Sequence, residues 1–476
     1  MRKWRTSLVV SVFIIYGLLV MPAVQAAMSG YIPGAHSVDV KAYDDLTTNN
    51  PVIGNLAEGG RLGLGPQDWN ENGKPVRPAW YTPQTKVAGL EISGMFEDSK
   101  FVIRIPEKWN GKLVVGGSPG IGDERRVDAL ISDYVLTRFD ANGASYAYAY
   151  SDKGTTGEAI PAPDGKIYPW AKAATSLLDP KDNLAEWHMR LHQLTVATKD
   201  LLKRTRGQVP TRTYVWGCSM GGYVTRYAIE NDGDLYDGGV DWEGNLWRPE
   251  ANILSTITVE LQNYLVLNNP NATAQDKEKA IAALNQLGLP TESQIVWKNH
   301  YEIKMWTPWF HALRLKFDPG STPYRNWWEY MDHPEDALNY DYASRIAIFN
   351  KTITPIQNTG NIKKPVISVF GTWDSQVLAK VNGLGYEKLV KENGKADIYR
   401  LYLVEHANHL DGIVGSPQWD KDKQLQPLLP YIHQAFNLLE DWVEKGVPAP
   451  ASQTIAVPQT TGKVIDIKTG QEIDKY

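Results

Sequence analysis

The segment Tyr214-Val-Trp-Gly217-Cys218-Ser219-Met220-Gly221-Gly222 joins a predicted strand to a predicted helix that begins near Tyr223. It contains a G-x-S-x-G pattern, which is typical of a strand that turns sharply into a helix and needs small residues on both sides of the serine. We call Gly217–Gly221 the elbow. The turn strains Ser219 and points its hydroxyl outward, beside the first backbone N–H groups of the helix. The segment therefore predicts a nucleophilic Ser219, with the Met220 N–H as one oxyanion donor.

Strands and helices are predicted to alternate on both sides of the elbow. Short apolar or alternating runs, which predict strands, lie at 101–106, 112–115, 145–150, 213–216, 364–370 and 397–404. Apolar residues at helical spacing lie between 187 and 202, from about 376 to 392 and from about 428 to 445. This alternation predicts an α/β fold, a mostly parallel sheet covered by helices on both faces, with a site at the carboxyl ends of the strands.

A serine hydroxyl needs a base to remove its proton and a carboxylate to orient that base. The predicted acid is Asp374, which directly follows the strand expected at 365–370 in Gly371-Thr-Trp-Asp374. Asp241, near the end of the strand after the elbow, is the alternative.

Two histidines compete for the role of base in Glu405-His406-Ala-Asn-His409, which follows the strand ending near Val404. His409 lies further into the loop, where the chain can curve back over Ser219. His406 abuts the strand, where a packing role is expected. We therefore predict His409 as the base.

The second oxyanion donor is expected in the Gly-rich turn Gly116-Gly117-Ser118-Pro119-Gly120, at the end of an earlier strand. Pro119 has no N–H, so the donor is Gly117, Ser118 or Gly120. Ser118 lies closest to the expected position, and an ordinary turn is the alternative.

The predicted core occupies residues 99–242 and 346–445. Residues 27–98, rich in Gly, Pro, Asn and Trp, are expected to form an irregular N-terminal wrap, and residues 446–476 a tail draped over the surface. Residues 243–345 contain helix-like stretches at 250–267 and 274–287 without a clear strand, which predicts a helical insertion.

The insertion is rich in tryptophan: seven of the 17 tryptophans lie between 242 and 342. Two interpretations remain open, a small helical core built from bulky side chains or an aromatic-lined lid over the site. Under the second interpretation, Trp306, Trp309, Trp327 and Trp328 are the candidate substrate-binding residues.

The first 26 residues are typical of a secretory signal peptide. Arg2, Lys3 and Arg5 precede an apolar run at 8–20, which is too short to span a bilayer, and small residues follow it. Cleavage is expected after Ala26. The sequence therefore predicts a secreted protein, extracellular or periplasmic, without a stable membrane anchor.

The composition excludes several classes of function. A net charge of −5, from 49 basic and 54 acidic residues, offers no surface for a polyanion, so no nucleic acid partner is expected. The single cysteine, Cys218, excludes an internal disulfide framework, a zinc site made of cysteines and an iron–sulfur cluster. The predicted chemistry needs no cofactor and no metal.

The elbow, Gly371-Thr-Trp-Asp374 and Asn408-His409-Leu-Asp411-Gly412 together resemble the α/β-hydrolase superfamily, over about residues 95 to 445. Within it, Gly-Cys-Ser-Met-Gly-Gly, the helical insertion and Tyr148-Ala-Tyr-Ser-Asp-Lys-Gly154 are similar to the secreted tannase and feruloyl-esterase-like group and to related polyester-oligomer hydrolases.

One departure from that group bears on the substrate. In tannases and feruloyl esterases, a cysteine before the serine pairs with a cysteine before the histidine. Here Cys218 is in place but residue 408 is asparagine, so that disulfide cannot form. The departure leaves the reaction class unchanged and the substrate class open.

These observations predict a secreted serine carboxylesterase that acts through an acyl-enzyme on small-molecule or oligomeric esters, with aromatic or oligomeric esters favoured. A secreted serine peptidase with the same fold is one alternative, because the triad chemistry is shared. A noncatalytic binding protein that kept the fold is the other. The oligomeric state is left open.

Overall fold

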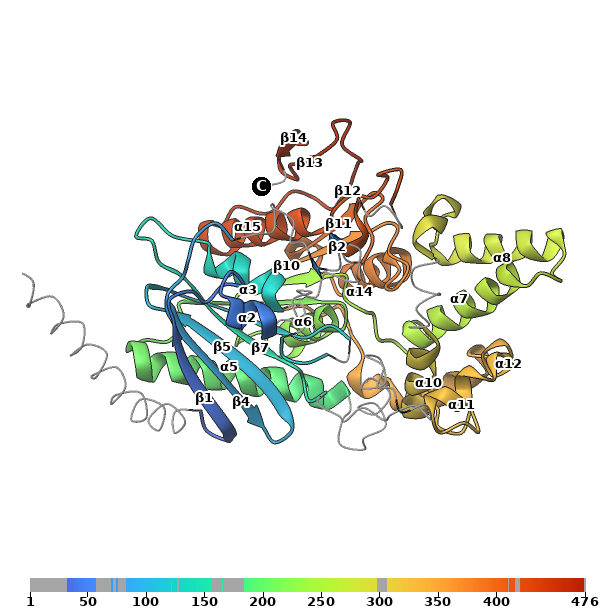
Figure 1. Ribbon diagram of the computed structural model, residues 1–476, viewed down its shortest axis with the longest axis horizontal. Coiled ribbons are helices and arrows are strands. Elements are labelled where there is room, and N and C mark those ends of the chain that lie inside the picture. The colour runs from blue at the N-terminus through green and yellow to red at the C-terminus, as the bar shows by residue number, and fades with distance from the viewer. Residues whose placement is uncertain are drawn as a thin grey trace, which may run out of the picture.

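The computed structural model describes residues 32–56, 70–71, 74–75, 83–120, 122–125, 128–155, 165, 184–297, 306–409, 411–415 and 420–474 (Figure 1). The expected signal peptide, residues 1–26, lies outside the described residues. Within these ranges, no helix combines the length and the apolar character needed to cross a membrane.

A sheet of ten strands forms the centre of the molecule, in the order β1-β4-β5-β7-β6-β8-β9-β10-β11-β12. In this order, every neighbouring pair from β7 through β6 to β12 is parallel. Every neighbouring pair from β1 through β4 and β5 to β7 is antiparallel. Their bounds are β1 (Ala35–Tyr43), β4 (Gly89–Phe96), β5 (Ser99–Pro106), β6 (Trp109–Gly117), β7 (Ser145–Ser151), β8 (Arg212–Cys218), β9 (Gly238–Trp242), β10 (Val366–Gly371), β11 (Tyr399–Val404) and β12 (Gln453–Ile455). This mostly parallel sheet confirms the predicted α/β-hydrolase fold.

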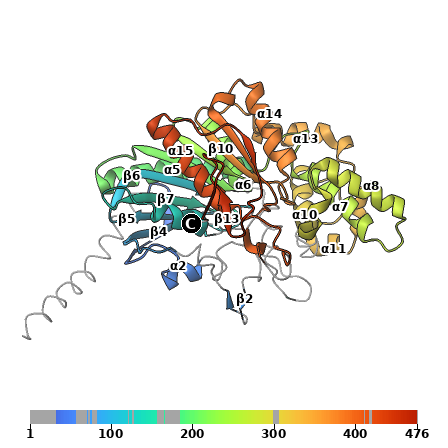
Figure 2. The same ribbon diagram turned by 90° about the horizontal axis from the view of Figure 1, so that it is seen from above.

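Helices cover both faces of the sheet (Figures 1 and 2). Side chains alternate along each strand, so neighbouring residues of β8 enter different cores: Val215 belongs to the core that contains side chains of α5, α6 and α14, and Trp216 belongs to the core that contains side chains of α3 and α15. The bounds are α3 (Asp128–Leu136), α5 (Leu184–Arg206), α6 (Met220–Asn231), α14 (Leu384–Glu392) and α15 (Leu429–Lys445).

The insertion after β9 forms a helical lobe beyond α6 and α14, at the right of both ribbon views (Figures 1 and 2). Its core is continuous with that of the sheet, because Trp247 lies between Tyr223 of α6 and Phe317 of the lobe, with ring centroids 6.1 and 5.0 Å apart. Its helices, with the one that follows, are α7 (Ile253–Asn268), α8 (Ala274–Leu287), α10 (Trp306–Phe317), α11 (Trp327–Met331), α12 (Pro334–Leu338) and α13 (Ile346–Thr352).

Short elements complete the chain. They are α2 (Pro51–Leu56), the pairs β2 (Asn70–Glu71) with β3 (Lys74–Pro75) and β13 (Lys463–Ile465) with β14 (Glu472–Asp474), the π-helix η6 (Ala379–Gly383), and the 3-10 helices η3 (Thr291–Ser293), η4 (Ala343–Arg345), η5 (Thr354–Ile356), η7 (Ala396–Ile398) and η8 (Asp411–Ile413).

The N-terminal region differs from the expected irregular wrap, because β1 and β4 extend the main sheet. Glycines interrupt the apolar pattern of β4 and hide the strand signal. At Gly94 a Cβ would lie 2.7 Å from the ring of Phe101, so a larger residue would displace that buried ring.

The C-terminal region also differs from the expected surface tail. Its strand β12 pairs with β11, and Ile455, Val464 and Ile467 are buried against the face that α15 covers. Residues 446–474 are therefore part of the fold.

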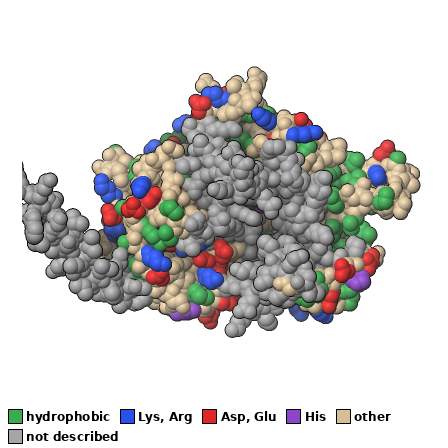
Figure 3. All heavy atoms as spheres, viewed as in Figure 1, with side chains coloured by type: hydrophobic (Ala, Val, Ile, Leu, Met, Phe, Trp, Pro, Cys, Tyr) green, Lys and Arg blue, Asp and Glu red, His purple; other side chains and the backbone are tan. Residues whose placement is uncertain are grey.

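Acidic and basic side chains are mixed across the face seen in Figure 3. On the described residues of this face, neither sign of charge gathers into an extended patch. This distribution agrees with the balanced composition.

Candidate active site

The elbow forms the junction between β8 and α6. Ser219 lies between the two elements with φ 58° and ψ −118°, in the left-handed half of φ that is costly for a residue other than glycine. Its N–H donates to the carbonyl of Trp242 at 2.8 Å, and its carbonyl accepts the N–H of Tyr223 at 3.0 Å. The strained conformation is thus held by β9 on one side and by α6 on the other.

Close backbone contacts explain the glycines of the elbow. A Cβ at 217 would lie 2.3 Å from the carbonyl oxygen of Gly221, and one at 221 would lie 2.2 Å from the carbonyl oxygen of Gly117. The glycine-rich turn after β6 therefore lies directly against the start of α6, where the fold expects its oxyanion donors.

The Met220 N–H belongs to the first residue of α6, so it has no acceptor within the helix. The prediction for Ser118 needs a correction: its N–H donates to the carbonyl of Ser151 at 2.9 Å, and its hydroxyl donates to Gly122 at 2.9 Å. With both donors of Ser118 in use, Gly117 and Gly120 remain as candidates for the second oxyanion donor.

Ser118 has a different function in the structure, because it accepts hydrogen bonds from a buried lysine. The Lys153 ammonium donates to the carbonyl oxygen and, at 2.6 Å, to the hydroxyl oxygen of Ser118, and it lies 5.0 Å from the centre of the Trp187 ring. Lys153 is fully buried and has φ 67°. The segment Tyr148–Gly154 thus fixes the turn that faces the elbow.

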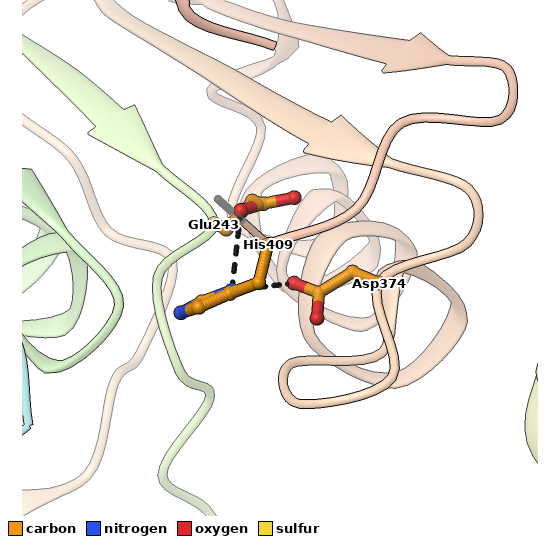
Figure 4. A group of neighbouring side chains, drawn as sticks. All are labelled: Glu243, Asp374 and His409. Atoms are coloured by element: carbon orange, nitrogen blue, oxygen red, sulfur yellow. Dashed lines mark hydrogen bonds and ion pairs between the residues drawn. The ribbon is translucent and has the colours of Figure 1, made fainter. Parts of the chain in front are cut away.

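The carboxyl ends of β10 and β11 bring Asp374 and His409 together (Figure 4). His409 Nδ1 donates to Asp374 Oδ2 at 2.7 Å, and both side chains are buried. Asp374 Oδ1 accepts the N–H groups of Gln376 and Val377 at 2.7 and 2.9 Å. These two donors leave Oδ2 facing the imidazole.

A second carboxyl group, missed by the sequence analysis, also faces His409. Glu243, directly after β9, has Oε2 3.2 Å from His409 Nδ1, and its Oε1 accepts the Gly371 N–H at 2.8 Å (Figure 4). The sequence does place Glu243 directly after the strand that follows the elbow. That position could be recognised as part of the site only with the knowledge that β9 lies beside β10, which the sequence did not provide.

Asp241, the alternative acid, is engaged elsewhere. It forms a fully buried ion pair with Arg226 of α6, whose Nε donates to its Oδ2 at 2.7 Å, and its Oδ1 accepts the Gly244 N–H at 2.8 Å. Its side chain therefore fastens the elbow helix to β9.

The electrostatics of the three groups are coupled. Burial opposes the charged imidazolium, but the charge and hydrogen bond of Asp374, with those of Glu243, outweigh it and raise the pKa of His409 above its ordinary value. Burial, followed by the like charge of Asp374, raises the pKa of Glu243 well above its usual range. The site thus favours the imidazolium form of His409 and disfavours a negative charge on Glu243 in addition to that on Asp374.

The Ser219 hydroxyl faces Asn245, donating to its Oδ1 at 3.4 Å. In the described parts of the chain, no hydrogen bond joins Ser219 to His409. The end of β9 links the two residues: the Ser219 N–H binds the carbonyl of Trp242, and the next residue, Glu243, faces the imidazole of His409.

His406 is directed into a different contact. Its ring stacks on Trp373, with centroids 3.9 Å apart and planes at 17°, and its N–H donates to Thr372 Oγ1 at 3.0 Å. His406 therefore packs against the loop that carries Asp374.

The four candidate tryptophans lie on two lobe helices, Trp306 and Trp309 on α10, Trp327 and Trp328 on α11. The side chains of Trp306, Trp309 and Trp327 lie outside the described residues. Trp328 is half-buried and packs against the main core. For this residue, the structure therefore agrees with the interpretation of a helical core built from bulky side chains.

Residues 336–470 match the family model described as 3HB-oligomer hydrolase (3HBOH). The matched range includes Asp374 and His409 and begins after Ser219. With the observed sheet, this match confirms the prediction of a carboxylic ester hydrolase with an α/β-hydrolase fold. No curated protein sequence matches the chain.

Several solved structures resemble the chain at low identity. Feruloyl esterase B from Aspergillus oryzae is 16% identical (87% of this chain, 88% of that one, TM-score 0.45), and an esterase from Aspergillus oryzae is 13% identical (92% and 90%, TM-score 0.49). Tannin acyl hydrolase from Aspergillus niger is 12% identical (93% and 88%, TM-score 0.44). At these values, none of them bears on the substrate of this chain.

The elbow glycines give a first prediction. Gly221→Ala places a methyl group against the backbone of Gly117, which cannot move aside without displacing β6, so we expect the free energy of unfolding to fall by about 3 kcal/mol or more. Thermal and urea unfolding measure this loss. Gly320→Ala is the matched control, because no atom lies within 4 Å of its added methyl group, and it should change stability by less than about 0.5 kcal/mol. Equal stability of the two variants would contradict the close contact.

A second prediction concerns the buried ammonium. Lys153→Met leaves the Ser118 oxygens without their donor, so the glycine-rich turn should shift and kcat for ester hydrolysis should fall about 10-fold or more, with KM little changed. Lys199→Met is the control, since that lysine donates to the carbonyl of Leu235, away from the elbow. It should alter stability without lowering kcat; parallel loss of kcat in both variants would show a general effect on folding.

Proposed function

We propose that this chain is a secreted serine esterase that hydrolyses oligomers of 3-hydroxybutyrate (3HB), with Ser219 as nucleophile, His409 as base and Asp374 as the carboxylate that orients the base. The observation that carries the proposal is the 2.7 Å hydrogen bond between His409 and Asp374, and the strained Ser219 at the carboxyl end of β8 supports it.

The reaction follows from the groups in place. In the neutral form of His409, which is the form that acts as base, Asp374 holds the proton on Nδ1, so Nε2 carries the lone pair that accepts the Ser219 proton as Oγ attacks the ester carbonyl. The oxyanion that forms accepts hydrogen bonds from the Met220 N–H and from Gly117 or Gly120. The imidazolium then protonates the leaving alcohol, and water repeats the sequence on the acyl-enzyme.

The substrate class rests on the family match. The range 336–470 contains the proposed acid and base with their strands, so the resemblance to 3HB-oligomer hydrolases includes part of the reacting machinery. An oligomer of 3-hydroxybutyrate offers a chain of ester bonds, each with a secondary alcohol as its leaving group. Aromatic esters, the other class favoured by the sequence, are the comparison in the test below.

Secretion is part of the proposal and is supported by the charged start and the apolar run of residues 1–26. Expression of the full chain in a host with a general export pathway should give an exported protein whose first residue is Ala27. N-terminal sequencing measures this, and an unprocessed chain retained in the cytoplasm would contradict it.

The proposed mechanism predicts that Ser219→Ala lowers kcat by about 10⁴-fold or more and abolishes labelling by a fluorophosphonate probe. His409→Ala should match it, and the double variant should be no worse than either, because the triad acts as a unit. Ser132→Ala is the control and should retain activity, because Ser132 is a buried serine of α3 that accepts a hydrogen bond from Arg104 of β5. Full activity of Ser219→Ala would exclude the mechanism.

The proposed substrate predicts a ranking of kcat/KM. A 3HB trimer should be hydrolysed at least about 10-fold more efficiently than methyl ferulate or a short acetate ester, since recognition of the second unit adds about 1 to 3 kcal/mol to transition-state binding. Preference for the ferulate would reassign the chain to aromatic esters, and cleavage of a peptide amide alone would favour the peptidase alternative.

A further inference from the structure

Glu243 occupies a position that the proposed triad does not use. We propose that Glu243 is a positioning residue for His409 that works alongside Asp374, so that the imidazole has two carboxyl partners and either one can support the reaction. This inference rests on the proposed function, since it assigns a task to a further residue of the same site.

The geometry places both carboxyl groups on one atom of the imidazole. Asp374 Oδ2 lies 2.7 Å and Glu243 Oε2 lies 3.2 Å from His409 Nδ1, and the two side chains approach from neighbouring strands, β10 and β9 (Figure 4). Asp374 accepts the shorter bond and is the primary partner. Glu243 is near enough to become the acceptor when the primary partner is lost.

Glu243 is held rigidly with one oxygen left for the site. Its Oε1 accepts the Gly371 N–H, its own N–H donates to the Val369 carbonyl at 3.0 Å, and its backbone has φ 49°. The residue is fully buried, and Oε2 forms no hydrogen bond of normal geometry within the described structure. A buried carboxyl oxygen without a full partner is costly, and here it points at the imidazole.

The surroundings of the two carboxyl groups explain why Asp374 is the primary partner of His409 and Glu243 the second one. Asp374 accepts two backbone N–H groups, while Glu243 accepts one, and burial followed by the charge of Asp374 raises the pKa of Glu243. Removing the Asp374 carboxylate removes that repulsion. Glu243 then ionises more readily and can take over the Nδ1 proton of His409.

The test is a double-variant cycle on ester hydrolysis. Asp374→Ala should lower kcat by about 10²-fold, less than the loss of about 10⁴-fold expected when a triad loses its only carboxylate. Glu243→Gln keeps the acceptor for Gly371 and should lower kcat by less than about 10-fold. Glu243→Gln in the Asp374→Ala background should lower kcat by at least a further 10-fold beyond the product of the single effects.

The pH profile separates this role from a purely structural one. In the described structure, Asp374 and Glu243 are the titratable groups that face His409 Nδ1. Loss of a negative partner disfavours the imidazolium, so the apparent pKa of the base in kcat/KM should be lower in the double variant than in Asp374→Ala alone. An unchanged pKa between these two variants overturns the proposal.

A matched control is available in Glu230, another buried carboxyl group. It lies in the last turn of α6, at the opposite end of the helix from Ser219, and accepts hydrogen bonds from Thr359, Gly360 and Tyr386. Glu230→Gln should lower the melting temperature and leave the pH profile unchanged. If Asp374→Ala fails to fold, Asp374→Asn, which keeps the acceptor for Gln376 and Val377, replaces it in the cycle.

The outcomes for the two proposals are distinct. If Ser219→Ala retains activity, the proposed triad itself fails. If Ser219 is required and kcat of the double variant equals that of Asp374→Ala, the triad stands and the role of Glu243 is overturned.

Discussion

The close approach of two backbone segments, Gly221 at the start of α6 and Gly117 at the end of β6, is the constraint on which the site depends. No side chain fits between them, since a Cβ on Gly221 would lie 2.2 Å from the Gly117 oxygen. The contact sets the start of the elbow helix beside the glycine-rich turn and holds Ser219 in a costly conformation. The ion pair between Arg226 and Asp241 then fastens the same helix to β9.

The parallel order of β8 to β11 brings further polar side chains to the edge of the sheet where Ser219 lies. Strands in parallel register end at the same edge, so the residues that follow β9, β10 and β11 meet there: Glu243, Asp374 and His409. The loops that carry Asp374 and His409 are joined further by the Trp373 N–H, which donates to the Ala407 carbonyl at 3.0 Å.

The sequence predicted what is encoded locally. The elbow, the α/β alternation and the helix at 274–287, identical to α8, follow from short-range patterns. Features that depend on non-local contacts were missed: β12 is a strand only because β11 offers an edge, and Ser118 is unavailable to an oxyanion because its N–H binds Ser151 in the adjacent strand. Glu243 was missed because the whole lobe separates β9 from β10 in the sequence.

The buried charges are arranged to match the charges that the proposed reaction creates. The Lys153 ammonium binds the turn that would supply the second oxyanion donor, while the Asp374 carboxylate, with the Glu243 carboxyl group beside it, faces the imidazole that would become positively charged. All three groups are buried and held by hydrogen bonds, so they need little reorientation as the charges appear. Groups that already face the positions where charge develops stabilise the transition state of the proposed reaction more than the ester that precedes it.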